Sequence, residues 1–276
     1  MDIATLIGLI VGVVLVAYGM ADPSTMMPSS MFFNPQAFAI VLGGTLAATL
    51  VNYPIKRIFG LFKVTAKVFL HRQNDDPLLL IQEMSGYAQI ARKQGVAALE
   101  GSISRIQNGY LQRGLENAIL TRDPAKLLDF LDNELDSMIE RHQSGQEIFY
   151  NMGSYAPAFG LLGTVMGLIL MMGGQSDNGT GMASFASDSE GSMNMLLTGM
   201  GRALVTTFYG VLFSNLFFIP IAGKLKTRTE DEVALNRIIR AGVLSIHERD
   251  HHLVLEEKLL TFVDKQTREM HRINGL

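Results

Sequence analysis

Four long apolar stretches, separated by charged segments, dominate the pattern of hydrophobic and polar positions. They cover residues 3–20, 37–51, 153–172 and 203–222, and none of them contains Asp or Glu. A helix needs about 20 apolar residues to cross a bilayer. The second stretch is short, but a helix over residues 33–53 reaches that length. The pattern therefore predicts an all-α, polytopic membrane protein with four transmembrane helices.

A cleaved signal peptide is an alternative interpretation of the first stretch. Signal peptides begin with basic residues and end at a small-residue cleavage site. Here Asp2 is the only charged residue ahead of the stretch, and Tyr18 and Met20 stand near its end. A retained transmembrane helix is the better interpretation.

The distribution of Lys and Arg predicts the orientation of these helices. Basic residues follow the second stretch and the fourth, whereas residues 21–36 and 173–201 contain none. The basic residues are Lys56, Arg57, Lys63, Lys67, Arg72, Lys224, Lys226 and Arg228. Because short cytoplasmic connections are enriched in Lys and Arg, we expect both termini and the middle segment to be cytoplasmic. Residues 173–192, rich in Gly and Ser, are then expected to form a flexible external loop.

The cytoplasmic segments carry apolar residues at helical spacing, such as Leu127, Leu131 and Leu135. Asp123 and Pro124 predict a helix start, with the Asp as N-cap. A second helical region is predicted over residues 230–262. We therefore expect four parts, which are a transmembrane hairpin (1–53), a cytoplasmic helical domain (54–150), transmembrane helices three and four (151–222) and a cytoplasmic helical tail (223–276).

Composition gives little support to an enzyme. Of the 276 residues, 48% are hydrophobic and 18% are charged, and there is no Cys for a disulfide, a thiolate nucleophile or a thiolate metal site. No phosphate-binding or nucleophile-elbow motif is found. His247 and His251 are four residues apart, with His252 adjacent, which is formally compatible with a metal. A solvated helix surface is the favoured interpretation of these three residues.

The third and fourth stretches offer hydroxyl groups where an ion path normally has a carboxylate. They contain Thr164, Thr206 and Thr207. Any one Thr can simply bond the carbonyl one turn back, but several together can provide oxygen ligands to a hard cation. Such a site still needs a negative charge, which another subunit would have to supply.

Small residues and a proline also mark the third stretch. Gly163 and Gly167 form a small-xxx-small surface for close helix packing, with Gly160 near the same face. Pro157 leaves a backbone carbonyl without its helical donor, which is tolerated in lipid only where protein or water satisfies it.

Three segments resemble the MotA/PomA family of flagellar stator A-subunits, which belongs to a superfamily with the TolQ and ExbB energisers. They are residues 156–167, 202–210 and 218–222. The similarity extends over nearly the whole chain, including Gly43 and Gly44 in the second stretch.

The resemblance implies a role for seven residues. Thr164 and Thr207 match threonines that line the ion path, with Thr206 beside them in sodium-type members; proton-driven members tend to have Ala at the position of Thr164. Pro157 and Pro220 match prolines associated with conformational coupling. Arg92 and Glu100, eight residues apart, match charges that face the rotor; without the resemblance they would be interpreted as a solvated helix surface.

The resemblance also implies partners and location. Five A-subunits are expected around two single-span B-type subunits, which supply an intramembrane Asp, and a rotor switch-complex protein is expected in the cytoplasm. The complex would lie in the bacterial inner membrane and transport Na⁺ or H⁺, with no tightly bound cofactor and no nucleic acid.

Some positions depart from the family pattern. Asn34 stands where PomA-like members have an acid, Gly101 and Ser104 replace further acids after Glu100, and Arg202 replaces an apolar residue. Residues 173–192 form a longer loop than is typical. Three alternatives stay open at this point: a proton-driven stator, a TolQ/ExbB-type energiser, which usually has three spans, and a helical scaffold that conducts nothing.

Overall fold

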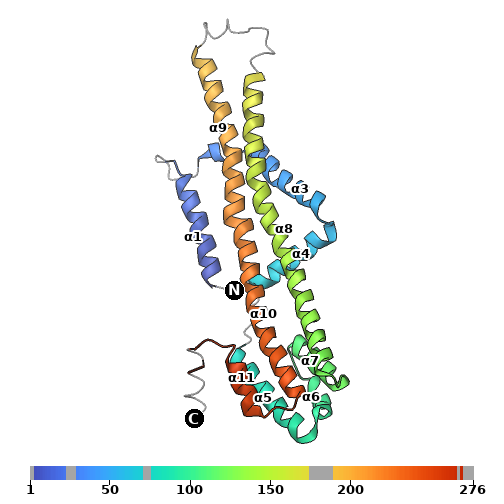
Figure 1. Cartoon of the computed structure of the whole chain (residues 1–276). Coiled ribbons are helices and arrows are strands. Elements are labelled where there is room, and N and C mark those ends of the chain that lie inside the picture. The colour runs from blue at the N-terminus through green and yellow to red at the C-terminus, as the bar shows by residue number, and fades with distance from the viewer. Residues whose placement is uncertain (1–2, 23–28, 71–75, 174–188, 266–267, 270–276) are drawn as a thin grey trace. The chain divides into compact units, whose positions relative to one another are not determined.

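The computed structural model describes residues 3–22, 29–70, 76–173, 189–265 and 268–269. Within these ranges every regular element is a helix, which confirms the predicted all-α fold (Figure 1). The chain divides into two compact units. Unit 1 comprises Met1–Arg72 and Ser144–Leu225, and unit 2 comprises Gln73–Gln143 and Lys226–Leu276. The units are defined by packing, whereas the four predicted parts refer to the membrane and remain a prediction.

Unit 1 contains the apolar stretches. Its elements are α1 (Ile3–Gly19), η1 (Ser30–Phe32), α2 (Pro35–Phe38), η2 (Ala39–Gly43), α3 (Gly44–Asn52), α4 (Ile55–Leu70), the C-terminal part of α8 (Pro124–Gly173), α9 (Ser189–Phe213), η5 (Ser214–Phe218) and the first residues of α10 (Ile219–His247). η1 is a 3-10 turn, while η2 and η5 are π-helical. Residues 174–188 of the predicted external loop lie outside the described ranges, whereas residues 189–192, which were also expected in the loop, form the first turn of α9.

Within the part of the chain that the structure describes, three helical stretches are long and apolar enough to cross a membrane by length and composition. They are Ser30–Asn52, Pro124–Met172 and Gly199–His247. The first predicted span corresponds to α1, which has 17 residues and so reaches only the lower end of the range for spanning helices, about 17–25 residues. The count of four spans therefore remains a prediction.

Aromatic side chains fasten the beginning of the second apolar stretch to α9. Phe32 packs edge-to-face on Phe208 at a centroid distance of 5.4 Å, and Phe38 does the same on Phe213 at 5.7 Å. Pairs of this geometry stabilise beyond the area that they bury. The Tyr209 ring contacts the rings of both Phe208 and Phe213, and its centroid lies 6.1 Å from that of Phe38. The cluster thereby fixes η1 and α2 against one face of α9.

Unit 2 is a set of short helices around a large apolar core. Its elements are α5 (Pro77–Gln94), η3 (Val96–Leu99), α6 (Glu100–Ile103), α7 (Gly109–Leu120), the first part of α8, most of α10, and α11 (His252–Leu260). Leu127 and Leu131 are fully buried and Leu135 is largely so, as their spacing predicted. The predicted helix start is also confirmed, because Asp123 Oδ1 accepts the Ala125 N–H at 3.0 Å where α8 begins.

The predicted helical region over residues 230–262 consists of two helices. α10 ends at His247, and α11 begins at His252 with His251 as its N-cap. Arg249, in the left-handed conformation with φ of 60°, turns the chain between them. The break between the two helices was not predicted, because apolar residues continue at helical spacing on both sides and no Gly or Pro marks the turn.

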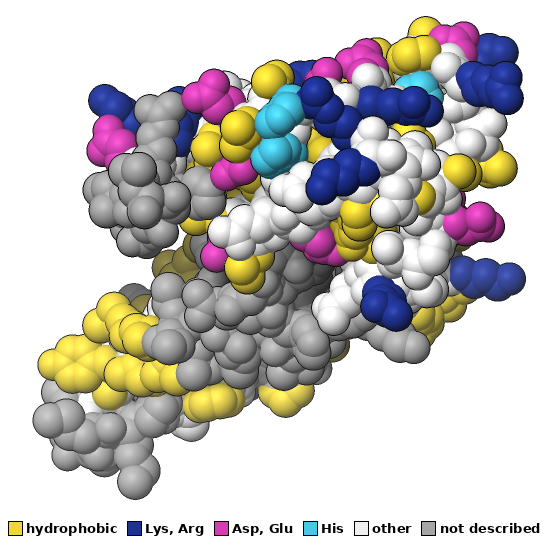
Figure 2. All heavy atoms as spheres, turned by 90° about the horizontal axis from the view of Figure 1, so that it is seen from below, with side chains coloured by type: hydrophobic (Ala, Val, Ile, Leu, Met, Phe, Trp, Pro, Cys, Tyr) yellow, Lys and Arg dark blue, Asp and Glu magenta, His cyan; other side chains and the backbone are white. Residues whose placement is uncertain are grey.

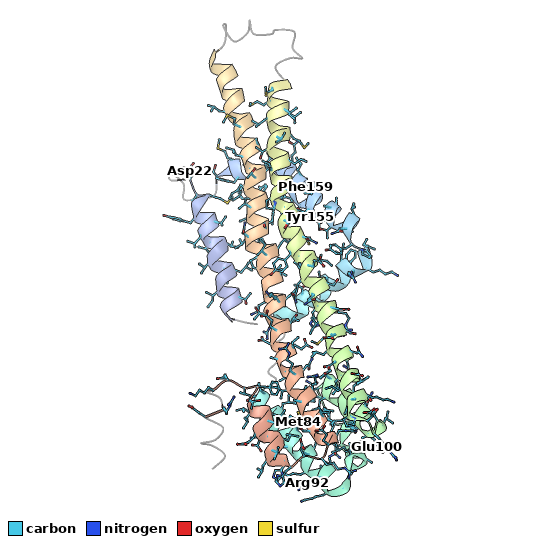
Figure 3. All side chains as sticks on the ribbon, in the orientation of Figure 1. Asp22, Met84, Arg92, Glu100, Tyr155 and Phe159 are labelled. Atoms are coloured by element: carbon cyan, nitrogen blue, oxygen red, sulfur yellow. The ribbon has the colours of Figure 1, made fainter. Side chains whose placement is uncertain are left out.

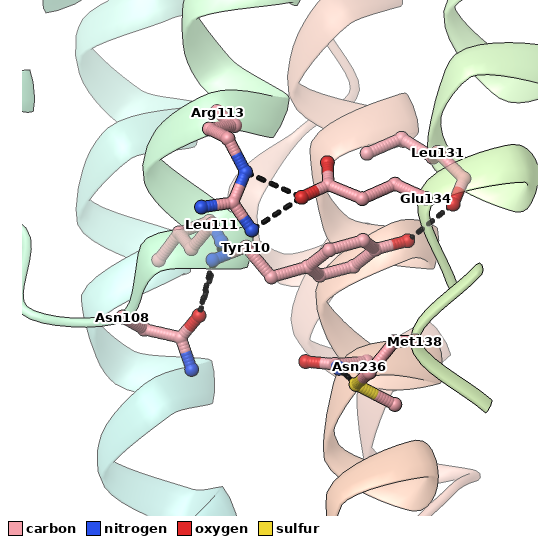
Figure 4. A network of polar contacts seen from close by, with 8 residues as sticks. All are labelled: Asn108, Tyr110, Leu111, Arg113, Leu131, Glu134, Met138 and Asn236. Carbon is pink, nitrogen blue, oxygen red and sulfur yellow. Dashed lines mark hydrogen bonds and ion pairs between the residues drawn. The ribbon is translucent and has the colours of Figure 1, made fainter. Parts of the chain in front are cut away.

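A polar network crosses the core of unit 2 (Figure 4). The Tyr110 hydroxyl donates to the Leu131 carbonyl at 2.9 Å, and Arg113 forms an ion pair with Glu134 beside it. Burial, followed by the charges of Glu134 and Asp132, raises the pKa of Tyr110 well above its ordinary value. The phenol therefore stays protonated and keeps its donor, which joins α7 to α8.

Candidate ion-path site

Small residues bring α8 and α9 into close contact. A Cβ atom added at Gly163 would lie 2.8 Å from the Thr206 Cβ, and one added at Gly167 would lie 3.0 Å from the Ala203 Cβ. The helices are equally close at Gly210 of α9, because a Cβ added there would lie 2.6 Å from the Ala156 carbonyl oxygen. The predicted close-packing surface of the third stretch is thereby confirmed, and its partner is α9.

The three predicted ion-path threonines meet at this contact. Thr164 Oγ1 of α8 lies 2.5 Å from Thr207 Oγ1 and 3.3 Å from Thr206 Oγ1. The Gly160 carbonyl oxygen is 3.0 Å from the hydroxyls of Thr164 and Thr206, and 3.4 Å from that of Thr207. The Ala203 carbonyl oxygen accepts from Thr206 at 2.6 Å and from Thr164 at 3.2 Å. Two helices thus contribute three hydroxyls and two carbonyl oxygens to one place.

The hydrogen bonds of this network are interchangeable. Each hydroxyl donates one hydrogen bond and accepts two, so several proton arrangements fit the same oxygen positions. Thr164 and Thr206 each reach a carbonyl one turn back, as an ordinary helical Thr does, and also reach across to the facing helix. Thr206 is buried, whereas Thr164 and Thr207 are half-buried. The site is a polar point with free lone pairs between two apolar helices.

No carboxylate takes part in the network among the residues that the structure describes. The same ranges hold no group of three or more His, Cys, Asp or Glu that could hold a metal ion. The His247 ring bonds the Thr121 carbonyl oxygen at 2.8 Å, and the end of α10 separates this ring from His251. The spacing of the two residues had suggested that both rings lie on one helix face, but the helix ends between them.

Pro157 lies inside α8, where it cannot donate to the Gly153 carbonyl four residues earlier. The Ser214 hydroxyl of the facing helix donates to that carbonyl instead, at 2.6 Å, and this bond is buried. Sequence reasoning expected some group to satisfy the carbonyl but gave Ser214 no role. The signal that could have indicated this role is a hydroxyl residue in the apolar stretch that packs against Pro157.

Pro220 follows an irregular turn. It is the second residue of α10, directly after the π-helical turn η5, in which the Ile219 N–H donates to the Ser214 carbonyl five residues earlier. π-Turns are rare and are frequent at functional sites. Ser214 therefore begins the wide turn that ends before Pro220 and also holds the carbonyl that Pro157 leaves free.

The beginning of the second apolar stretch is tied to α9 by Tyr209. Its hydroxyl donates to the Phe32 carbonyl and lies 3.3 Å from the Asn34 N–H, which donates to it. The Asn34 side chain caps α2 by accepting from the N–H groups of Gln36 and Ala37, at 3.0 and 3.2 Å. Asn34, which replaces the family's acid, thus acts here as a helix cap. Arg202 lies on α9, and its side chain is outside what the structure describes.

The two predicted rotor-facing charges lie on unit 2 (Figure 3). Arg92 is in the last turn of α5 and Glu100 is the first residue of α6, and both side chains are exposed. Gly95, with φ of 86°, turns the chain between them. Their side chains are open to a partner, and their role stays a prediction.

Comparison with known proteins finds relatives along nearly the whole chain. Residues 102–238 match the MotA/TolQ/ExbB proton channel family. The chain is 33% identical to Motility protein A of Bacillus subtilis over 273 residues, which cover 97% of this chain and 93% of that protein. It is 31% identical to Chemotaxis protein PomA of Vibrio alginolyticus over 270 residues, 98% of each chain.

The fold agrees with a solved stator. The structure of the flagellar MotAB stator complex from Bacillus subtilis superposes with a TM-score of 0.81 at 31% identity, over 96% of this chain and 97% of that one. Sequence and fold lead to the same family over almost the full length. The chain therefore belongs to the MotA/PomA family of flagellar motor stator A-subunits, whose members are ion-channel components and not enzymes.

Proposed function

We propose that this A-subunit works in a sodium-driven stator and that Thr164, Thr206 and Thr207 line the ion path. The observation that carries the proposal is the convergence of three hydroxyls and two carbonyl oxygens on one point between α8 and α9. Hard cations take oxygen ligands, and a hydroxyl oxygen can replace a water molecule around Na⁺. The methyl group of an alanine at position 164 cannot.

The missing negative charge comes, in this proposal, from a partner. Oxygen dipoles alone compensate only a small part of the free energy that a cation loses when it leaves water for the membrane interior. An intramembrane Asp of a single-span B-type subunit supplies the charge beside the threonines. The likeness to the Bacillus subtilis MotAB stator complex supports assembly with such a subunit. Five A-subunits surround two B-subunits in this arrangement.

The complex lies in the bacterial inner membrane in this proposal. Both termini face the cytoplasm, because the basic residues cluster after the second and fourth apolar stretches. Unit 2, which carries Arg92 and Glu100, is then cytoplasmic. It can meet the rotor switch-complex protein there.

Ion movement does the work of rotation. One charge that crosses a potential of 100 mV releases about 2.3 kcal/mol, several times the thermal energy. Binding and release of the ion at the partner carboxylate shift α8 at Pro157 and the start of α10 at Pro220, where the helices are irregular. Arg92 and Glu100 pass the motion to the rotor through complementary charges.

Alanine substitutions test the ion path. Thr164→Ala and Thr207→Ala, each co-expressed with the B-type partner, are expected to reduce Na⁺ flux and swimming strongly. Thr45→Ala is the matched control, because the Thr45 hydroxyl is buried in the same unit but bonds only the Val41 carbonyl one turn back. Normal flux in both path variants would refute a conducting role for these hydroxyls.

A separate experiment decides the ion. Swimming that requires Na⁺ and resists a protonophore supports the sodium assignment. Swimming that persists without Na⁺ but stops with a protonophore makes the stator proton-driven, while its assignment as an A-subunit stands.

A further inference from the structure

Two crossed pairs of side chains bond the end of α3 to α8. The Asn151 side-chain amide donates to the Tyr53 hydroxyl at 2.6 Å, and the Asn52 side-chain amide donates to the Tyr155 hydroxyl at 3.2 Å. Each side of the contact thus contributes one Asn and one Tyr. These four residues form the Asn–Tyr clamp (Asn52, Tyr53, Asn151 and Tyr155).

The backbone at Tyr53 allows both bonds to form. Tyr53 is the C-cap of α3 and is extended, with φ of −130° and ψ of 144°. Pro54 follows, and the residue before a proline avoids helical geometry. Adjacent residues of a continuous helix do not face the same neighbour, but residues 52 and 53 both reach α8. Their partners on α8 are four residues apart and therefore share one helix face.

The face of α8 that meets α3 continues beyond Pro157. Phe159 keeps the four-residue spacing of Asn151 and Tyr155, and it packs on Gly44, where an added Cβ would lie 2.7 Å from Phe159 Cγ. Figure 3 shows Tyr155 and Phe159 on the part of α8 beside α3. The contacts before Pro157 are directional hydrogen bonds, whereas the contact after it is apolar. A ring on a glycine can slide, because no donor or acceptor fixes its position.

We infer that the Asn–Tyr clamp positions the Pro157 turn for coupling, because it makes the segment of α8 before Pro157 move together with the corner between α3 and α4. This corner consists of Tyr53 and Pro54, and α4 is the last helix of unit 1 before the chain enters unit 2. The inference rests on the proposed shift of α8 at Pro157. It adds the corner and α4 to the elements that this shift moves.

The clamp contributes little to holding the fold together. Side-chain hydrogen bonds between membrane helices are individually weak. The same part of α8 is fixed in the core of unit 1 by the buried side chains of Phe149, Met152 and Ala156. Loss of the clamp should therefore change the coupling of movements more than the stability of the protein.

The clamp also contains no charged group. Figure 2 shows Lys, Arg, Asp and Glu side chains interspersed on the face of the molecule seen from below, where salt weakens electrostatic interactions. Hydrogen bonds between neutral groups are not screened in this way. The contribution of the clamp should therefore persist when the Na⁺ concentration is varied, so that it can be separated from the ion dependence of the motor.

Removal of single oxygen atoms tests the clamp. Tyr53→Phe and Tyr155→Phe each delete one acceptor, and the double variant deletes both. Tyr150→Phe is the matched control, because Tyr150 is an exposed Tyr one residue before Asn151 on the same helix. Each variant is made in the full chain and co-expressed with its B-type partner. The stall torque of tethered cells, the Na⁺ flux and the unfolding temperature of the purified complex are measured for each.

The double variant is expected to reduce the stall torque roughly twofold or more, a size typical of changes along a coupling route. The flux per complex should stay at the parental level, and the unfolding temperature should fall by less than about 4 °C. Each single variant should have an intermediate torque, and Tyr150→Phe should have the parental torque. Parental torque in the double variant overturns the inference. A flux that falls in proportion to the torque also overturns it, because the clamp would then be a structural support.

A cross-link tests the joint movement directly. This chain has no Cys, so Asn52→Cys combined with Tyr155→Cys introduces a single pair of thiols into it. Without a linker the torque should fall as in Tyr155→Phe, and a short bismaleimide linker between the thiols should restore it. A linked protein with no recovery of torque would contradict the joint movement. Loss of flux in the Thr164 and Thr207 variants is an independent result, so the two proposals can fail separately.

Discussion

The Ser214 hydroxyl donates a 2.6 Å hydrogen bond to the Gly153 carbonyl oxygen. Gly153 stands four residues before Pro157, so this carbonyl has lost the donor that a continuous helix provides. Ser214 also opens the π-helical turn before Pro220. One side-chain bond therefore connects the irregular segments of two facing helices.

Ser214→Ala is expected to lower the free energy of unfolding by about 1–3 kcal/mol, because it leaves a buried carbonyl without a donor. Thermal unfolding of the detergent-purified complex measures this. Ser154→Ala is the matched control, since the Ser154 hydroxyl is exposed and bonds only the Tyr150 carbonyl of its own helix. Equal effects of the two substitutions would contradict the role given to Ser214.

A double-mutant cycle tests the same bond from the other side. Pro157→Ala restores an N–H that can reach the Gly153 carbonyl, so the cost of Ser214→Ala should shrink in that background. The measurement is again the unfolding temperature, compared across the four proteins. If Ser214→Ala costs the same in the parent and in the Pro157→Ala background, the serine and the proline are not coupled.

Gly163→Ala is expected to separate α8 from α9, because its Cβ would lie 2.8 Å from the Thr206 Cβ. Overpacking of this kind costs about 1–3 kcal/mol and would displace the threonine hydroxyls. Ion flux and swimming should both fall. Gly201→Ala serves as the control on α9, since nothing within 4 Å of this chain meets its added Cβ. Unchanged flux in Gly163→Ala would show that the close contact is not needed for conduction.

Tyr110→Phe removes the buried bond to the Leu131 carbonyl and is expected to destabilise the protein by about 1 kcal/mol or more. Tyr87→Phe is the comparison, because the Tyr87 hydroxyl bonds the exposed Glu83 carboxylate on the same helix. That substitution should cost clearly less. Unfolding by denaturant reports both values, and a larger cost at Tyr87 would be the contrary result.

The stability of the protein should rise with pH in the range where His251 titrates. Partial burial, then the charges of Arg92 and His252, lower the pKa of His251 from 6.5. At a pH between the lowered pKa of the folded state and the ordinary pKa of the unfolded state, the unfolded state binds more protons than the folded state. Stability is therefore lost as the pH falls through that window. The neutral ring also accepts the Leu253 N–H at 3.3 Å as the cap of α11.

His251→Asn checks this pH dependence. Asn keeps the cap without titrating, so unfolding measured between about pH 5 and 7 should depend less on pH than in the parent. The same slope in both proteins would assign the dependence to another group.

Much of the candidate site follows from the sequence. The spacing of Gly160, Gly163 and Gly167 predicted a close-packing surface, and the hydroxyls of Thr164, Thr206 and Thr207 were recognised as the polar groups of two apolar stretches. The all-α fold followed from helical spacing and from the absence of strand-like alternation. What these patterns could not supply was pairing, because periodicity identifies a face but not the residue opposite it.

The features that escaped prediction share one cause. Ser214 receives its importance from a carbonyl 61 positions earlier, and Arg249 breaks a helix where composition favours continuation. A π-turn such as η5 adds one residue to a single turn and leaves the apolar pattern almost unchanged. Each depends on a backbone group, and backbone groups are the same in every sequence.

The Gly160 carbonyl has two lone pairs and three hydroxyls within reach. Its hydrogen bonds can therefore exchange by rotation about single side-chain bonds, a motion of picoseconds to nanoseconds. Collective helix movements take microseconds to milliseconds. Exchange of ligands among these oxygens would therefore add no delay on the timescale of a motor step, which in the proposed mechanism leaves the slower backbone movements around Pro157 and Pro220 to limit the rate.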